Sequence, residues 1–252
     1  MKPTIAIIWF PGTNCEEETL RAVDAAGMDG TIVRWNQQIG EFAGYIIPGG
    51  WSYEDRIRAG AIAAHDQIMQ KIKQEAAAGK PILGICNGCQ VIAETGLVPR
   101  GAAEPEIALA PNKNPFISGY FCTHTFVKIK KKTAFTLLND GDILKIPIAH
   151  GEGRFTTSND SIKNTIKNNA AVVYCTEQGD EIDQFPTNPN GSLFNIAGLA
   201  NDKGNVLALM PHPERCSFAH QSGTRANTNT AAAGLKIFQS MKRYIDNGNT
   251  LR

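Results

Sequence analysis

The chain has 252 residues, and 42% of them are hydrophobic, which is enough for a sizeable core. Its formal net charge is +1, whereas a nucleic-acid-binding protein would usually carry a basic stripe. The one basic run, at 128–132, is expected to hold lysines that guard an edge strand. No stretch approaches the ~20 apolar residues that a membrane span needs, so neither nucleic acid nor membrane is an expected partner.

Six cysteines are scattered at positions 15, 86, 89, 122, 175 and 216. In a chain of this length, such scatter does not indicate a disulfide framework. No secretory leader is recognisable either, so we expect a cytoplasmic protein in which most cysteines are small core residues.

The first half of the chain alternates strand and helix patterns. Apolar runs predict strands at 4–9, 31–35, 45–48 and 81–85. Helices are predicted from a capping box at Thr13 and Glu16 to about 26, then over 61–78 and from 88 to about 94. We expect Gly27 and Gly79 to end the first two helices. Buried strands that alternate with helices predict an α/β fold with a parallel sheet.

The second half is rich in strand patterns, at 120–131, 143–148, 171–175, 196–200 and 206–210, and a helix is predicted over 231–245. Asp, Asn, Pro and Gly at 180–191 predict a surface loop. Because no linker or internal repeat separates the halves, a single domain over 1–252 is expected.

A candidate nucleophile lies in the sequence Gly84-Ile85-Cys86-Asn87-Gly88, which has the form G-x-C-x-G between a predicted strand and a predicted helix. The related serine motif is a sharp strand-to-helix turn that exposes a nucleophile. At the N-terminus of the helix the macrodipole favours a thiolate, and the N–H of Asn87 would face a developing oxyanion. A buried cysteine in an ordinary turn is the structural alternative.

The same residues allow a redox interpretation, because Cys86 and Cys89 form a C-x-x-C motif at the start of a helix. A zinc site is less favoured, since no second cysteine pair or histidine pair accompanies the motif. We therefore expect no metal in this chain.

A candidate base follows the last predicted strand. Pro211 and Pro213 keep the backbone extended, so His212 and Glu214 should point the same way. A carboxylate beside an imidazole fixes its tautomer, as in a nucleophile–base–acid triad. His150 is the other candidate base, in a segment where glycines flank a carboxylate. The alternative for His212 is a histidine packed after an edge strand, and the alternative for His150 is a turn between strands.

A Gly pair, Gly49-Gly50, ends the third predicted strand. Active sites in parallel sheets gather at the carboxyl ends of strands, so the N–H of Gly50 could complete an oxyanion hole. The residues at 51–53 would then line the mouth of the site. A plain glycine turn is the alternative.

Together, P-G-G at 48–50, G-x-C-x-G-x-Q at 84–90 and H-x-E at 212–214 resemble the class I, triad-type glutamine amidotransferases. Segments 10–15, 48–56, 150–155, 188–192 and 210–215 are similar to the glutaminase subunits of phosphoribosylformylglycinamidine synthase, and the likeness spans about 4–245. Cys89 departs from that pattern, which usually has a bulky apolar residue there.

The resemblance implies a Rossmann-like, flavodoxin-type α/β fold. It also implies that Cys86 attacks the carboxamide of glutamine, that His212 transfers the proton, and that Glu214 orients His212. The backbone N–H groups of Gly50 and Asn87 would hold the oxyanion. The implied substrate-binding residues are Gln90, Gly49, His150, Gly151 and Glu152.

The resemblance also implies partners. No phosphate-binding G-x-x-x-x-G-K-[ST] motif is present, so no cofactor is expected in this chain. A separate synthetase subunit would use the ammonia, with ATP and magnesium, in purine biosynthesis, and a small third subunit often bridges the two. A thiol–disulfide oxidoreductase, a non-catalytic subunit of the same fold and an amidotransferase with another acceptor are the alternatives.

Overall fold

The computed structural model describes residues 1–102, 104–138, 141–222 and 231–251. Its main sheet has nine strands: β1 (Thr4–Trp9), β2 (Asp29–Arg34), β3 (Gly44–Ile47), β4 (Ile82–Ile85), β6 (Phe121–Ile129), β7 (Ile143–His150), β9 (Ala170–Cys175), β10 (Ile196–Ala200) and β11 (Val206–Leu209). Their order is β2-β1-β3-β4-β11-β10-β9-β6-β7. A separate two-stranded sheet pairs β5 (Ala108–Ala110) with β8 (Arg154–Thr156).

The two halves of the main sheet differ in strand direction. The five strands from β2 to β11 are parallel, whereas each pair from β11 to β7 is antiparallel. The predicted α/β architecture is therefore confirmed, with a mixed sheet. The helices are α1 (Glu16–Ala25), α2 (Ala61–Ala64), α3 (Gln67–Ala77), α4 (Asn87–Glu94), α5 (Lys163–Asn169) and α6 (Leu235–Asp246).

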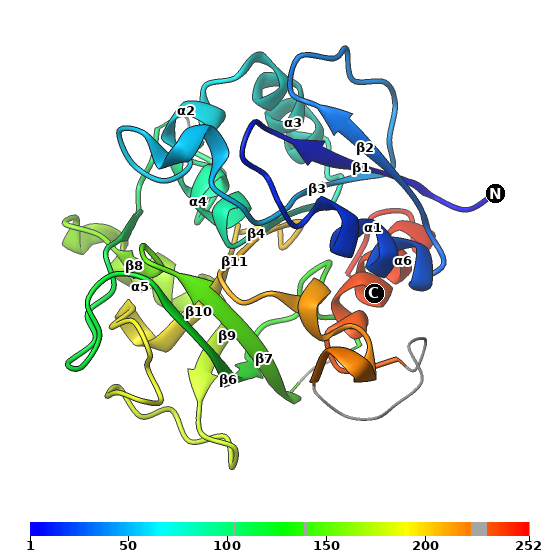
Figure 1. The fold of residues 1–252 in the computed structure, drawn as a ribbon. Coiled ribbons are helices and arrows are strands. Elements are labelled where there is room, and N and C mark those ends of the chain that lie inside the picture. Colours follow the sequence, from blue (N-terminus) through cyan, green and yellow to red (C-terminus); the bar gives the residue numbers. More distant parts are fainter. Residues whose placement is uncertain (103, 139–140, 223–230, 252) are drawn as a thin grey trace.

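Helices lie on both sides of the parallel half. Figure 1 shows α1 and α6 together on one side, and α2, α3 and α4 together on the other. β3, β4 and β11 are buried throughout, and so are the four central residues of β1, as a sheet covered on both faces requires. No helix within the described ranges is long and apolar enough to cross a membrane.

Several predicted details are wrong. Thr13 does not cap α1, because its hydroxyl accepts a hydrogen bond from the N–H of Phe10 at 3.0 Å and the N-cap is Cys15. The helix predicted over 61–78 is two helices, since the backbone of Asp66 is extended and its carboxylate accepts a hydrogen bond from the hydroxyl of Tyr53 at 2.6 Å.

The sheet also corrects two expectations about the surface. Lysines at 128–132 do not guard an edge, because β6 pairs on both sides and β7 is the edge strand. The segment 180–191 is irregular as predicted, but Asn188 and Asn190 near its end are buried and bond to the chain around them.

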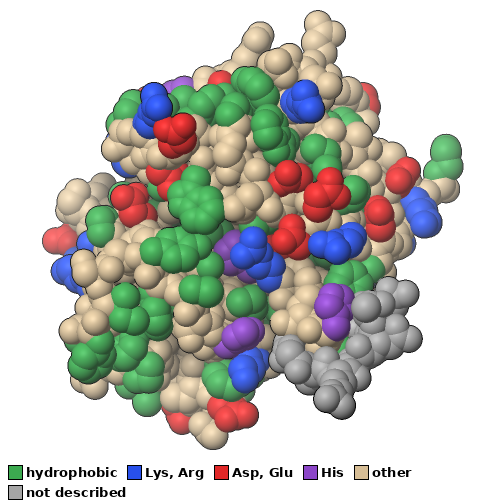
Figure 2. Space-filling model, in the orientation of Figure 1, with side chains coloured by type: hydrophobic (Ala, Val, Ile, Leu, Met, Phe, Trp, Pro, Cys, Tyr) green, Lys and Arg blue, Asp and Glu red, His purple; other side chains and the backbone are tan. Residues whose placement is uncertain are grey.

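Four neighbouring parallel strands position the loops of interest. β1, β3, β4 and β11 end side by side, and the residues that follow them form one rim of the sheet. Figure 2 shows that hydrophobic side chains gather from the centre to the lower left of the face drawn in Figure 1. Acidic and basic side chains are mixed over much of the rest of that face.

Candidate active site

Cys86 follows β4 directly and stands at the N-terminus of α4. Its φ of 50° and ψ of −104° are unusual for a residue with a side chain, and such strain is typical of functional turns. The flanking glycines are needed for packing. A Cβ on Gly88 would lie 1.9 Å from the carbonyl oxygen of Ile47, and one on Gly84 would lie 2.3 Å from that of Gly88. The predicted strand–turn–helix context of the motif is confirmed.

His212 follows β11 and forms a close pair with Glu214. Oε1 of Glu214 lies 2.6 Å from Nδ1 of His212, and both side chains are buried. The pairing leaves Nε2 of His212 buried and without a protein hydrogen-bond partner among the described residues. Burial alone would lower the pKa of His212, but the charge of Glu214 and the nearby thiols of Cys86 and Cys15 raise it well above its ordinary value.

Gly49 shows how close Cys86 and His212 lie. A Cβ on this glycine would be 2.9 Å from Cε1 of His212, 3.1 Å from Sγ of Cys15 and 3.4 Å from Cβ of Cys86. The imidazole and the two cysteines therefore surround one point, where only a glycine fits. The absence of a side chain at Gly49 therefore lets His212, Cys15 and Cys86 pack close to one another.

Two backbone N–H groups beside Cys86 are free. Among the described residues, neither the N–H of Gly50 nor that of Asn87 donates to a protein acceptor. Gly50 is fixed from both sides, because the N–H of Trp51 bonds the carbonyl of Gly12 at 2.8 Å and the N–H of Asn14 bonds that of Gly49 at 3.1 Å. The loop after β1 thus holds the loop after β3 in place.

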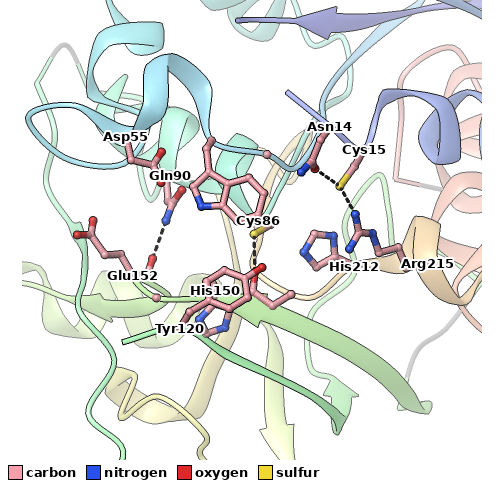
Figure 3. A pocket seen from close by; sticks show the side chains of 14 residues that line it. Asn14, Cys15, Asp55, Cys86, Gln90, Tyr120, His150, Glu152, His212 and Arg215 are labelled. Carbon is pink, nitrogen blue, oxygen red and sulfur yellow. Dashed lines mark hydrogen bonds between the residues drawn. The ribbon is translucent and has the colours of Figure 1, made fainter. Parts of the chain in front are cut away.

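These residues open into one cavity of about 250 Å³, which Figure 3 shows with Cys86 at its centre. The volume suits a small metabolite, because drug-sized ligands usually occupy pockets of roughly 300–1,000 Å³. The predicted residues Gly50, Cys86, Gln90, His150, Gly151, Glu152 and His212 line it, together with Asn14, Cys15, Trp51, Asp55, Tyr120, Ala149 and Arg215. Of the residues expected at the mouth, Ser52 and Tyr53 do not line it.

One end of the cavity is acidic and tightly hydrogen-bonded. The amide nitrogen of Asn87 donates to Asp55 at 3.1 Å and to Gln90 at 2.9 Å, while the amide nitrogen of Gln90 donates to the carbonyl of Glu152 at 2.8 Å. Burial and the charge of Glu152 raise the pKa of Asp55 to about 6. Two carboxylates that repel each other at a cavity end suit a cationic group of a ligand.

His150, the other predicted base, is placed differently from His212. Its Nδ1 bonds Oδ1 of Asn112 at 3.1 Å, and that oxygen also accepts from the N–H of Gly153 at 3.1 Å. Asn112 therefore fixes the proton on Nδ1. Burial and the charge of His212 lower the pKa of His150 to about 3, so the ring is neutral at physiological pH. Without a carboxylate partner, His150 is a poorer candidate for the base than His212.

The redox interpretation loses support in the structure. Cys89 is completely buried inside α4, and burial raises its pKa well above the ordinary value. A redox motif needs a second thiol that can attack or be attacked.

One group of described residues has donor atoms close enough for a metal. Those of Cys15, His212 and Glu214 lie within 4.8 Å of one another. A metal there would have to break the His212–Glu214 hydrogen bond and lie beside Arg215, whose Nη2 donates to Sγ of Cys15 at 3.1 Å. We interpret the group as a proton-transfer site.

The fold and the site together define a glutamine amidotransferase of the triad type. The family described as a CobB/CobQ-like glutamine amidotransferase domain matches residues 2–245. A phosphoribosylformylglycinamidine synthase subunit PurQ from Methanothrix thermoacetophila is 46% identical over 96% of this chain and 98% of its own length. Its counterpart from Pyrococcus horikoshii is 40% identical over 95% and 97%.

A solved structure agrees with these relatives. A chain from PurLQS of Thermotoga maritima superposes with a TM-score of 0.76 at 32% identity, and the match covers 97% of this chain and 99% of that one. This chain belongs to the family of the phosphoribosylformylglycinamidine synthase subunit PurQ, as its motifs predict.

Proposed function

We propose that this chain hydrolyses glutamine to glutamate and ammonia at Cys86 and supplies the ammonia to a synthetase subunit. The observation that carries the proposal is the meeting of Cys86 with the buried His212–Glu214 pair in one cavity. A nucleophile, a base and a carboxylate that orients the base are the parts that acyl transfer needs.

The reaction follows from the arrangement. Nε2 of His212 takes the thiol proton of Cys86, and the sulfur attacks the carboxamide carbon. The oxyanion that forms faces the free N–H groups of Gly50 and Asn87. When the tetrahedral intermediate collapses, His212 returns the proton to the leaving nitrogen, and ammonia departs. Water then attacks the thioester with His212 as base, which releases glutamate and restores the thiol.

The acidic end of the cavity suits the α-ammonium group of glutamine. Asp55 and Glu152 supply two carboxylates there, and Asn87 links Asp55 to the turn that holds the nucleophile. A bound ammonium would relieve the repulsion between the carboxylates and lower the pKa of Asp55. Recognition at one end would thereby align the carboxamide at the other.

An exposed aromatic patch supports docking of a partner beside the cavity. Trp51 and Tyr120 stack with ring centroids 5.8 Å apart and are 44% and 49% exposed. Phe121 follows Tyr120 and packs on Phe185, which also contacts the 80% exposed Phe116 at 5.4 Å. Exposed aromatic groups of this size usually mark interaction sites.

We infer that the occupant of the patch is the synthetase subunit. Ammonia stays uncharged only along a dry route, so a partner that seals the apolar rim of the cavity would keep it from the solvent. The solved relative comes from PurLQS, which agrees with an assembly. In this proposal the synthetase subunit holds ATP and magnesium, and a small third subunit bridges the two. Isolated, the chain should have low glutaminase activity.

A reconstituted assay tests the proposal. The chain and the synthetase subunit are mixed with formylglycinamide ribonucleotide, ATP and magnesium, and amidine formation is followed with glutamine or with ammonium chloride. Cys86→Ala should abolish the glutamine-dependent reaction and leave the ammonium-dependent reaction intact. Full glutamine-dependent activity in Cys86→Ala would refute the proposal, as would equal glutaminase activity with and without the synthetase.

A further inference from the structure

We propose that Cys15 is a positioning residue that holds the guanidinium of Arg215 away from Glu214, so that Glu214 remains paired with His212. The inference rests on the proposed function only in its consequence for catalysis. From the sequence, most of the cysteines are expected to be small core residues, and no separate role is expected for Cys15. In the structure it lines the cavity next to His212.

The sulfur of Cys15 acts as a neutral acceptor. Its S–H donates to Oδ1 of Asn14 at 3.1 Å, and the sulfur accepts from Nη2 of Arg215 at 3.1 Å. Burial raises the pKa of Cys15, although the contact with His212 opposes this, so the thiol keeps its proton at neutral pH. Arg215 is thereby held by a group that does not neutralise its charge.

Arg215 is poised to form a different pair. Its Nε is 4.0 Å from Oε1 of Glu214, whereas charge-assisted hydrogen bonds are normally about 2.7–2.9 Å long. That Nε is buried and has no hydrogen-bond partner among the described residues, and the same holds for Oε2 of Glu214. A small displacement of the guanidinium would give a direct arginine–carboxylate pair, which is often bidentate.

One hydrogen bond from Arg215 holds the guanidinium in place, and a longer charge contact with α1 lies beside it. Cys15 at the start of α1 accepts one hydrogen bond, and Glu18 within α1 lies 4.0 Å from Nη2. Figure 3 shows Arg215 reaching past His212 to the sulfur of Cys15. Without Cys15 the guanidinium would be free to approach Oε1 of Glu214, the oxygen that bonds Nδ1 of His212 at 2.6 Å.

The consequence concerns the charge that His212 experiences. Glu214, Cys86 and Cys15 are the groups that act on its ring, and the charge of the ring acts in turn on His150 and Tyr120 across the cavity. Glu214 has the largest raising effect of these groups. A direct ion pair between Arg215 and Glu214 would offset the negative charge of Glu214 and lower the pKa of His212. The imidazole would then be a weaker base toward Cys86.

Nuclear magnetic resonance of ¹⁵N-labelled histidine in the full chain tests the inference without any substrate. Cys15→Ala should lower the pKa of His212 by roughly one unit or more, the usual effect of a changed neighbouring charge. Cys15→Ser, whose hydroxyl still accepts from Arg215, should stay close to the wild type. Cys15→Ala combined with Arg215→Met should return the pKa toward the wild-type value, because no guanidinium remains to compete.

Cys216→Ala is the matched control, since it removes a buried thiol beside the carbonyl of His212 that does not hold Arg215. Its His212 titration should be unchanged. An unaltered pKa in Cys15→Ala would overturn the inference, and so would a double variant as strongly shifted as Cys15→Ala. Failure of the glutaminase assay with a normal titration series would instead count only against the proposed function.

Discussion

Oε1 of Glu214 lies 2.6 Å from Nδ1 of His212, and both side chains are withdrawn from solvent. His212 itself is extended, but Pro213 begins a 3-10 helix over Pro213–Cys216, so the extended backbone predicted through Glu214 is wrong. The turn into this helix brings the carboxylate of Glu214 to Nδ1 of His212. The hydrogen bond fixes the proton on Nδ1 and leaves Nε2 to exchange a proton with Cys86. The catalytic proposal depends on this tautomer of His212, with the proton on Nδ1.

Replacing Glu214 by Gln keeps the size of the side chain but removes its charge. The pKa of His212 should fall, because the charge of Glu214 is the main influence that raises it. We expect glutamine-dependent turnover to drop by on the order of 10²-fold or more, as when a triad carboxylate is neutralised. Steady-state rates in the reconstituted complex measure this, and near-normal turnover would remove Glu214 from the mechanism.

Asp55→Asn tests the recognition of the α-ammonium group. The asparagine can still accept from Asn87 but carries no charge, and a hydrogen bond to a charged group is worth about 1.5–3 kcal/mol. The KM for glutamine should therefore rise about 10-fold or more, with a smaller change in kcat. Asp66→Asn is the control, because Asp66 bonds Tyr53 outside the cavity.

The pH dependence of kcat/KM gives a second test of the role of Asp55. The pKa of Asp55 is raised to about 6, so its charge is lost as the pH falls through that value. In the wild type, kcat/KM for glutamine should fall over this range. Asp55→Asn should show no such decrease in kcat/KM. An identical decrease in both proteins would show that another group titrates.

His150 should make the chain less stable in acid. Its pKa is lowered to about 3 in the folded chain, whereas an unfolded histidine titrates near about 6.5. Between these values the unfolded chain binds a proton that the folded chain does not. The free energy of unfolding therefore falls as the pH falls, by up to about 1.4 kcal/mol per pH unit from this residue.

Urea unfolding of His150→Gln between pH 7 and pH 5 isolates that contribution. The variant should lose less stability over this range than the wild type, because glutamine does not titrate. The exposed His124, replaced by Gln, is the control for the histidine-to-glutamine change at a position outside the cavity. Parallel curves for the wild type and His150→Gln would contradict a buried neutral imidazole.

The aromatic patch can be tested apart from the chemistry. Phe116→Ser with Phe185→Ser should weaken binding to the synthetase subunit at least about 10-fold, since buried aromatic groups dominate interface energies. Ile143→Ser is the control, because Ile143 is 37% exposed at the opposite end of β7 from His150. Calorimetry measures the binding, and unchanged affinity in the double variant would move the docking surface elsewhere.

Much of the fold follows from local patterns, because strands covered on both faces read as continuous apolar runs. β1 matches its predicted bounds, β4 and β11 are one residue shorter than predicted, and β3 is shifted by one residue. The pairing of distant strands does not follow from such patterns. The insertion of β11 beside β4, which brings His212 to Cys86, depends on contacts across more than a hundred residues and is visible only in the structure.

The catalytic candidates were predictable because each stands in a short motif with a mechanical reason. Cys15, Asp55 and Asn112 were missed as site residues, since their roles arise from loops that meet in space. A partial clue existed for two of them. Cys15 and Asp55 follow β1 and β3, and loops at the carboxyl ends of neighbouring parallel strands share one rim.

The most direct test of the central claim is peptide mass spectrometry after treatment with the chloroketone analogue of glutamine. We predict one adduct, on the peptide that contains Cys86, and protection of that site by excess glutamine. Cys89→Ala should label normally, and Cys86→Ala should not label. A principal adduct on Cys15 or Cys89, or labelling that glutamine does not prevent, would contradict Cys86 as the nucleophile that attacks glutamine.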